Sequence, residues 1–497
     1  MEMFSPHRLH TRCTALLVTA TLIISGIFSS AIASSNFELP DFGDPSGSIM
    51  SPEDERRLGQ AFMRSVNRAM KIESDPLLIS YIESLGARLV ANSGDANQPF
   101  SFFIVRNPVV NAFAGPAGNI GIHTGLILTT QSESELASVV AHEIAHVTQK
   151  HLARTFDMAS GMGFATTAAI IAALVLGAAS KNSDVGRAAA IGVQAGMMQK
   201  QINFTRENEK EADNVGIRIL ANSKFDPRAM PTFFMRLGKV NMAYETHQLP
   251  EFLRTHPISK NRMAEAMGRA ETYPYKQYKD SKNYHLAYIT LREQKFKNPG
   301  QAINFFKKTL DDGRYRNAEA QRYGLVRAYI RAHQYQDALK QVNRLLAKSP
   351  NRVHYLIAKS EILYKTKRVK QAITLLQKGL RTHPGNYPLT VHYANSLMHS
   401  GNASKAEKLL ENLIKIRPYD PSIYKMAAVA AGKAKHNSQA HYFLAEHHYL
   451  SGDLTSAERQ LEVALNNPSN NYYLNAKMAA RLKEIKQEKS DLKKRRR

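Results

Sequence analysis

The sequence is poor in the residues that form covalent cross-links and thiolate metal sites. Cys13 is the only cysteine among 497 residues, and tryptophan is absent. One cysteine cannot close an intramolecular disulfide, so the fold has to depend on buried apolar surface. The hydrophobic content of 43% is sufficient for that. The length predicts about two or three domains.

The first residues follow the pattern of a secretory signal peptide. Arg8 and Arg12 precede an apolar run at residues 14–28, and an Ala-Ile-Ala motif ends at Ala33. Positive, apolar and small residues in that order predict a cleaved signal over residues 1–33. The alternative is an uncleaved signal anchor. Cleavage would also remove the only cysteine, and export of a thiol-free mature chain favours a bacterial periplasm.

Acidic residues are scarce in the second half of the chain. Residues 284–497 contain 39 Lys and Arg against 16 Asp and Glu, whereas residues 1–283 contain 28 against 26. This asymmetry predicts two modules with different partners. An exported protein rarely meets nucleic acid, so we expect none. Anionic lipid headgroups or acidic protein surfaces suit a basic module, and a solvated basic face is the alternative.

Long apolar runs are also rare. After the N-terminal run, residues 161–179 continue for 19 residues without a charged side chain, which approaches the length of a membrane span. Alanine and glycine dominate this stretch, and it lies between the two segments expected to share a metal ion. We expect a buried or amphipathic helix. An element that touches the membrane or acts as a lid, and a true span, are the alternatives.

The first half of the chain predicts helices with a small sheet. One helix opens at Ser51, where proline follows the capping serine, and a second spans about residues 75–92. Residues 100–123 are rich in aromatic and β-branched residues, and a Gly-Pro-Ala-Gly turn interrupts them, which predicts strands. Helical spacing returns over about residues 132–152 and 187–221.

Alanine and proline recur with one period beyond residue 283. The spacing is 34 within two series, Ala338, Ala372 and Ala406, and Pro350, Pro384 and Pro418. Small residues where helices pack, with proline at the end of each unit, are typical of tetratricopeptide repeats. A weaker first unit fits Ala302 and Phe306. Ala457 lies one and a half periods after Ala406, which predicts an extra helix or insertion near residues 419–438.

The segment His142-Glu143-Ile144-Ala145-His146 carries the chemistry. Residues four apart project from one face of a helix, so both imidazoles can bind one tetrahedral zinc ion. Zinc lowers the pKa of water to about 7, and Glu143 is placed to take a proton as water attacks a peptide carbonyl. Apolar flanks direct the histidines toward a core, where polar groups need partners. Two surface histidines on an amphipathic helix are the alternative.

A catalytic zinc ion needs a third protein ligand and an open fourth position. Glu209 is the best candidate, because Glu209 and Asp213 share one helix face. Asp213 can then accept a hydrogen bond from a ligating imidazole. Spacing alone leaves Glu207 and Glu211 as rival ligands, and a solvated acidic helix face as the alternative.

Four segments resemble, in the same order, the HtpX- and BepA-type zinc peptidases of peptidase family M-forty-eight. They are NAFAGPAGNIGIHTGLI, VVAHEIAHVTQKH, NFTRENEKEADNVGI and LRTHPISKNRMAEA, within about residues 50–275. With its signal peptide and repeats, the whole chain is most similar to the periplasmic BepA type. The resemblance implies a zinc endopeptidase with a chaperone-like role, whose partners are misfolded or stalled outer-membrane proteins and their assembly machinery.

The resemblance also implies roles for individual residues. Its E-x-x-A-D motif supplies the third metal ligand through Glu209, and Asp213 matches the aspartate that supports a ligand. His256 is implied near the metal, where it caps the fourth position at rest or is an ordinary loop residue. Arg262 is implied to stabilise the tetrahedral intermediate. A substrate backbone is implied to dock on the strand Asn111, Ala112, Phe113 and Ala114.

The expected architecture is α+β and mostly helical. A zincin-type metallopeptidase domain with a small sheet precedes an α-solenoid of tetratricopeptide repeats. The expected parts are a signal peptide (1–33), an extended lead-in (34–50), the peptidase domain (51–275), the repeat domain (284–486) and a basic tail (487–497).

The predicted activity is cleavage of internal peptide bonds with one zinc ion per chain. Two alternatives remain open at this point. One is a chaperone or adaptor that does not cleave and uses zinc structurally, and the other is a membrane-embedded metallopeptidase. His123 and His151 are expected to be structural or solvated.

Overall fold

The protein is represented by a computed structural model that describes residues 51–95, 98–152, 171, 206–243, 251–466 and 471–494. The predicted signal peptide, the lead-in and, apart from Ile171, the apolar stretch at residues 161–179 lie outside these residues. Residues 50–497 form one compact unit. Within the described part of the chain, we find no helix that is both long enough and apolar enough to cross a membrane.

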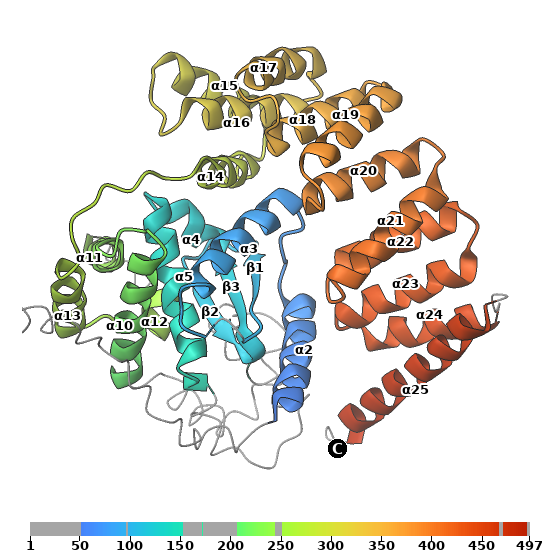
Figure 1. Ribbon diagram of the computed structural model, residues 1–497, viewed down its shortest axis with the longest axis horizontal. Helices are drawn as coiled ribbons and strands as arrows, with labels where there is room; N and C mark the ends of the chain where they lie inside the picture. Colours follow the sequence, from blue (N-terminus) through green and yellow to red (C-terminus); the bar gives the residue numbers. More distant parts are fainter. Residues whose placement is uncertain are drawn as a thin grey trace, which may run out of the picture. The chain divides into compact units, whose positions relative to one another are not determined.

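Two helices begin the described chain (Figure 1), as the sequence predicts. α2 (Pro52–Ala69) starts where the Ser51 hydroxyl accepts a hydrogen bond from the Asp54 amide at 3.1 Å. α3 (Pro76–Val90) starts in the same way at Asp75. These side-chain acceptors satisfy amides that have no partner within their own helix. The serine and the aspartate, each followed by proline, therefore set where the helices begin.

A small three-stranded sheet follows. β1 (Ser101–Val105), β2 (Ala112–Gly115) and β3 (Asn119–His123) lie in the order β1-β3-β2, with β1 parallel and β2 antiparallel to β3. The turn between β2 and β3 requires Gly118, because its φ is +66° and an added Cβ would lie 2.2 Å from the Pro99 carbonyl oxygen. β2 forms an edge of the described sheet and can accept another strand.

Six further helices are described in the N-terminal half. They are α4 (Thr124–Thr129), α5 (Glu133–Thr148), α10 (Arg206–Asn222), α11 (Ala229–Ala243), α12 (Glu251–Thr255) and α13 (Lys260–Glu271). α3 and α5 pack on the sheet, and α10 packs on α5 (Figure 1). Buried side chains from all these layers, such as Ile104, Val140 and Ile217, form one core. α5 is the central helix, since its side chains are buried from Glu133 to His146.

Helices in antiparallel succession make up the rest of the described chain. They are α14 (Lys282–Gln294), α15 (Pro299–Asp311), α16 (Ala318–Arg331), α17 (Tyr335–Lys348), α18 (Val353–Lys365), α19 (Val369–Thr382), α20 (Tyr387–His399), α21 (Ala403–Ile416), α22 (Pro421–Lys433), α23 (Asn437–Leu450), α24 (Leu454–Asn466) and α25 (Tyr472–Lys494). Ala338, Ala372 and Ala406 are fully buried, as expected where helices pack closely. Residues 487–494, expected in a basic tail, belong to α25.

The repeat period continues where the sequence predicted an extra helix or insertion. α22 and α23 begin 34 residues after α20 and α21, respectively. Ala406 lies in α21, the second helix of its pair, whereas Ala457 lies in α24, which follows a complete pair. Ala406 and Ala457 are therefore one and a half periods apart because they lie in different helices of their pairs. The prediction of an insertion near residues 419–438 is therefore wrong.

α14 belongs to two cores. Tyr284, Ala287 and Leu291 pack in the core of the N-terminal half, whereas Leu286 packs among the first repeats. The Tyr284 hydroxyl also donates a hydrogen bond to the Thr130 carbonyl at 3.2 Å. The expected start of the repeat domain at residue 284 thus falls within a helix that both halves share.

Ion pairs also join α2 and α3 to the later repeats. The Arg417 guanidinium pairs with the Glu83 carboxylate of α3, and Arg64 of α2 pairs with Glu488 of α25 at 2.7 Å. α3 contacts α20 as well. One wall of the repeats therefore lies against a helix that also packs on the sheet.

Candidate active site

α5 presents two histidines and a glutamate inside the N-terminal half. The helix starts at Ser132, whose hydroxyl accepts a hydrogen bond from the Glu135 amide at 3.2 Å. His142 and His146 project from the same face, and their Nε2 atoms lie 3.0 Å apart. Both rings and the Glu143 side chain are buried. The structure thus brings together the two imidazoles that the spacing predicts.

α10 brings Glu209 to the same point. Its Oε1 lies 3.4 Å from His146 Nε2, and its Oε2 lies 3.6 Å from His142 Nε2. The helices can approach because Gly216 faces α5, where an added Cβ would lie 3.3 Å from the His142 nitrogen. The rival Glu207 is exposed on α10.

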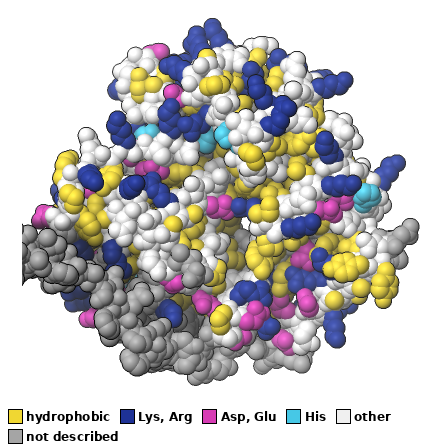
Figure 2. Space-filling model, in the orientation of Figure 1, with side chains coloured by type: hydrophobic (Ala, Val, Ile, Leu, Met, Phe, Trp, Pro, Cys, Tyr) yellow, Lys and Arg dark blue, Asp and Glu magenta, His cyan; other side chains and the backbone are white. Residues whose placement is uncertain are grey.

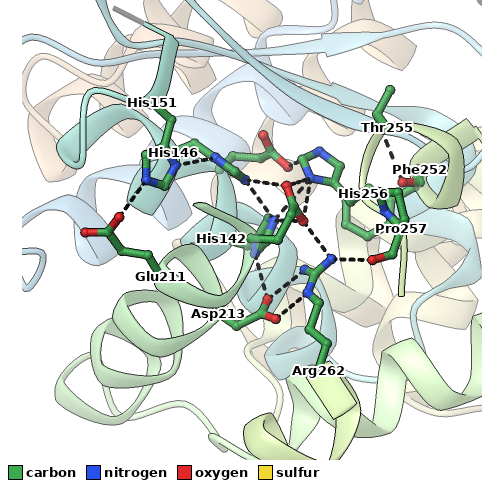
Figure 3. Close-up of polar contacts among 12 residues, drawn as sticks. His142, His146, His151, Glu211, Asp213, Phe252, Thr255, His256, Pro257 and Arg262 are labelled. Atoms are coloured by element: carbon green, nitrogen blue, oxygen red, sulfur yellow. Dashed lines mark hydrogen bonds and ion pairs between the residues drawn. The ribbon is translucent and has the colours of Figure 1, made fainter. Parts of the chain in front are cut away.

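His256 completes a compact group of four donors (Figure 3). One donor atom each from His142, His146, Glu209 and His256 lies within 4.8 Å of the others. His256 Nδ1 is 3.3 Å from His142 Nε2 and 3.0 Å from Glu209 Oε1. Four ligands placed tetrahedrally at zinc–ligand distances would lie about 3.3–3.4 Å apart. The four donors are therefore close enough together to hold one metal ion.

Asp213 and Arg262 lie next to this group and contact two of its members (Figure 3). Asp213 Oδ1 lies 3.0 Å from His142 Nδ1. Arg262 donates from Nε and Nη2 to the two Asp213 oxygens at 2.6 and 2.9 Å, and its Nη1 lies 2.6 Å from Glu209 Oε2. The guanidinium is buried and shared between two carboxylates. It therefore holds Glu209 in place, together with Asp213, which contacts His142.

His151 supports His146 in the same manner, a role that the sequence reasoning missed. Its Nδ1 lies 2.8 Å from His146 Nδ1, and its Nε2 lies 3.0 Å from Glu211 Oε2 (Figure 3). If His146 binds a metal through Nε2, its Nδ1–H donates to His151, whose Nε2–H donates to Glu211. His151 is fully buried, so it is not solvated. Glu211, a rival for the third ligand, instead contacts His151.

Glu143 lies between the metal donors and the edge strand. α5 packs against β2 here, which brings the carboxylate close to the backbone of Ala114, and Glu143 Oε1 lies 3.5 Å from His256 Nε2. Burial raises the pKa of Glu143. Phe113 on this strand is buried, and so is Asn111, which was predicted to lie on the strand but directly precedes it. The predicted docking strand is therefore adjacent to the predicted catalytic carboxylate.

Burial and neighbouring charges shift the pKa values of the other site residues in opposite directions. Burial lowers the pKa of His142, but Asp213 and Glu209 outweigh it and raise the pKa to about 9. Burial dominates for His146, whose pKa is well below its usual range. For Glu209, the neighbouring imidazoles outweigh burial and hold the pKa well below its usual range. These directions favour the neutral form of His146 and the ionised form of Glu209, whereas the raised pKa of His142 means that a metal ion has to displace a proton from that ring.

His123 lies away from this group. Its ring packs edge-on against Phe113 with the ring centroids 6.1 Å apart, and it is buried. Burial lowers its pKa to about 4, so the ring is neutral near pH 7. Its position agrees with the structural role expected from the sequence.

The chain matches known family profiles over both halves. Residues 76–270 match Peptidase family M48, and residues 323–387 and 363–430 match tetratricopeptide repeat profiles. The four donors and Glu143 all lie within the first match. The fold and the site together define a metalloendopeptidase that carries tetratricopeptide repeats.

Similarity to curated proteins extends over nearly the whole chain. It is 32% identical over 482 residues to the Beta-barrel assembly-enhancing protease of Escherichia coli (strain K12), covering 97% of each chain. It is 34% identical to the Putative beta-barrel assembly-enhancing protease of Vibrio cholerae serotype O1, covering 81% of this chain and 82% of that protein. The chain therefore belongs to the family of beta-barrel assembly-enhancing proteases.

Other similarities are more limited. Mitochondrial metalloendopeptidase OMA1 of Arabidopsis thaliana is 32% identical over 159 residues, 32% of this chain and 29% of that protein. Among solved structures, the yeast Tom70 crystal structure aligns at 12% identity with a TM-score of 0.29, over 72% of this chain and 82% of that one. That structural similarity is too low to inform the function.

Proposed function

We propose that this protein is a periplasmic zinc endopeptidase that cleaves misfolded or stalled outer-membrane proteins and has a chaperone-like role in their assembly. The observation that carries the proposal is the buried group of His142, His146 and Glu209 beside Glu143. The names of the relatives from Escherichia coli and Vibrio cholerae support the class of substrate. The predicted signal peptide supports the location.

We assign one zinc ion per chain to His142, His146 and Glu209. Two imidazole nitrogens and a carboxylate oxygen form a donor set that zinc prefers at catalytic sites. Their separations are short enough for one metal ion, and each donor belongs to a buried side chain. When bound, zinc supplies Lewis acidity that makes water nucleophilic near neutral pH.

Glu143 acts as the general base and then as the general acid. Its raised pKa makes the carboxylate a better proton acceptor near neutral pH. The carboxylate takes a proton from the attacking water and delivers it to the leaving amine. The carboxylate lies close to Ala114 on the edge strand, where a substrate carbonyl would lie.

His256 occupies the fourth position of the resting site. Its Nδ1 lies among the other three donors, and its Nε2 lies 3.5 Å from Glu143. A catalytic site must keep one position open for water or substrate. Departure of His256 from the group would provide that position, so His256 acts as a cap that keeps the site latent.

Four residues position the ligands. Asp213 Oδ1 and His151 Nδ1 lie 3.0 and 2.8 Å from the second nitrogens of His142 and His146. In the tautomers that leave both Nε2 atoms free for a metal, these second nitrogens carry the protons and point them at Asp213 and His151. Glu211 fixes the His151 ring, and Arg262 fixes Asp213. Because Arg262 already pairs with two carboxylates, we assign it a positioning role in place of direct contact with the reaction intermediate.

The substrate backbone docks on β2. An extended peptide can add to an open sheet edge through main-chain hydrogen bonds. Asn111, Ala112, Phe113 and Ala114 supply that edge, and Ala114 already lies close to Glu143. A peptide on this edge would pass directly beside the catalytic carboxylate.

The repeats recruit proteins and contact surfaces of opposite charge. Lys and Arg side chains are spread over the visible face of the repeats, and Asp and Glu are few among them over the upper repeats but more frequent over the later ones at the lower right (Figure 2). This surface suits outer-membrane proteins, their assembly machinery and peripheral contact with an anionic membrane. Nucleic acid is not expected as a partner.

The test is a Glu143→Gln variant assayed with a denatured outer-membrane protein as substrate. We expect unchanged zinc content and a loss of cleavage of about 100-fold or more. Glu207→Gln, on the exposed face of α10, is the matched control and should cleave like wild type. Undiminished cleavage by Glu143→Gln would exclude Glu143 as the base. Full biological function without cleavage would favour an adaptor with structural zinc.

A further inference from the structure

A groove of about 530 Å³ lies between α3 and the residues that begin α18 and α20. α3 contributes Ser80, Tyr81 and Ser84 to its wall. The repeats contribute Arg352 and His354, among others. None of the four metal donors lines it, so it is separate from the active site.

The groove lacks acidic side chains. None of its lining residues is Asp or Glu. Arg352 donates from Nη1 to the neutral Asn283 Oδ1 at 3.2 Å. None of the ion pairs found among the described residues includes Arg352. An arginine in such a setting can bind an anionic group with charge-assisted hydrogen bonds.

The hydrogen-bonding capacity of the groove is mostly that of donors. Asn283 and Asn386 both line the groove. The Oδ1 of Asn283 accepts a hydrogen bond from Arg352, and the Oδ1 of Asn386 accepts one from the Leu389 amide at 3.0 Å. Their side-chain amide N–H groups remain available to a ligand. Ser80 adds a hydroxyl that can donate. A ligand rich in acceptor oxygens, such as a peptide with a carboxylate, matches this arrangement.

His354 also lines the groove and is only 8% exposed. Its imidazole carries no negative charge, so it leaves the wall of the groove without an anionic group.

The size and apolar lining favour a short peptide segment. Leu77, Tyr81 and Val353 give the groove apolar surface beside the polar groups. Its volume falls in the range of ligand-binding pockets and would hold on the order of three or four residues. We propose that this groove binds a carboxylate of a polypeptide, from a free C-terminus or an acidic side chain, with Arg352 as its main contact.

Tyr81 links the groove to α5, the helix that carries His142 and His146. The ring of Tyr81 lines the groove, and its hydroxyl donates to Glu133 Oε1, in the first residue of α5, at 3.2 Å. A peptide in the groove would therefore be held by the peptidase half and the repeats together. The proposal does not depend on catalysis, because it concerns binding alone.

The test measures binding of a labelled peptide to the full chain with Glu143→Gln, which prevents cleavage. The probe is fluorescein-labelled alanyl-leucyl-alanyl-leucine with a free C-terminal carboxylate. We expect saturable binding with a Kd below about 1 mM, and binding at least about tenfold weaker for the C-terminal amide. Equal affinity for acid and amide, or no saturable binding, overturns the proposal.

A third peptide identifies the source of the carboxylate. Alanyl-leucyl-glutamyl-leucine amide carries its carboxylate on a side chain only. Binding as tight as that of the free acid supports recognition of acidic side chains. Binding as weak as that of the first amide supports recognition of the C-terminus.

Variants locate the site. Arg352→Gln should weaken binding about tenfold or more, and Ser84→Tyr, which fills the groove from α3, should abolish it. Arg344→Gln is the matched control, since Arg344 is exposed on α17 outside the groove, and should bind like the parent chain. If Arg352→Gln does not fold, Ser84→Tyr still tests the site. Unchanged binding by Ser84→Tyr overturns the proposal.

Discussion

Gly216 of α10 lies directly against the backbone of His142 in α5. A Cβ at Gly216 would stand 3.3 Å from the His142 nitrogen and 3.4 Å from its Cα. Contacts this short require a neighbour to shift, and a helix backbone does so less readily than a side chain. The missing side chain allows α10 to bring Glu209 to the metal donors on α5.

Gly216→Ala should reduce zinc affinity although alanine is the better helix former. We expect the helices to separate by a few tenths of an ångström, which lowers the free energy of unfolding by about 1–3 kcal/mol. The higher helix propensity of alanine restores about 1 kcal/mol of this loss. Zinc titration against a competing chelator measures the affinity. Gly268→Ala on α13 is the control, because no atom lies near its added Cβ. Wild-type zinc affinity in Gly216→Ala would show that this contact does not set the ligand geometry.

The central chemistry could be predicted from the sequence because it depends on local periodicity. His142 and His146 are one helical turn apart, so the helix alone places both rings on one face. Glu209 and Asp213 share a face for the same reason, but spacing could not separate Glu209 from its acidic neighbours. That choice needed either the family resemblance or the contact with α5.

The parts that were missed depend on turns and packing. His151 follows the end of α5, and Lys150 before it has a φ of +52°, so helical periodicity does not apply there. This turn brings His151 back to His146. In the repeats, a buried alanine marks either helix of a pair, so Ala457 suggested an insertion that the helix spacing excludes.

His151→Phe should weaken zinc binding without removing a ligand. The aromatic ring remains, but the acceptor for the His146 Nδ1–H is lost, so His146 is less firmly oriented. Loss of such a partner lowers metal affinity by about 10- to 100-fold. Competitive zinc titration measures this, and Glu211→Gln should have a smaller effect in the same direction. An unchanged zinc affinity in His151→Phe would assign His151 to packing alone.

His256→Ala should retain zinc and cleave a short peptide faster than wild type. The substitution removes a donor 3.0 Å from Glu209 and leaves three ligands, which is sufficient at a catalytic site. Initial rates with a fluorogenic peptide, together with zinc content, test this. A slower rate at full zinc content would contradict the capping role and indicate that His256 takes part in the reaction.

Acid should destabilise the repeats through His354. Burial lowers its pKa to about 3 in the folded chain, from an ordinary value of 6.5. The unfolded chain therefore binds a proton below about pH 6.5 that the folded chain does not, and stability falls as the pH drops toward 3. The loss approaches about 1.4 kcal/mol per pH unit within this window.

His354→Phe removes this proton linkage and should flatten the dependence of Tm on pH between about pH 7 and 5. Calorimetry on both chains at several pH values measures the slopes. The metal ligands titrate in both chains, so the difference between the slopes isolates His354. Parallel profiles would show that His354 does not contribute.

Zinc content is the most direct test of the central claim. Metal analysis of protein purified in the presence of zinc should find about one ion per chain in wild type and in Glu143→Gln, because Glu143 is not a ligand. Glu209→Gln should lose most of the metal while remaining folded. One zinc per chain in Glu209→Gln would contradict the assignment of the third ligand, and absence of zinc from the wild-type protein would contradict the account as a whole.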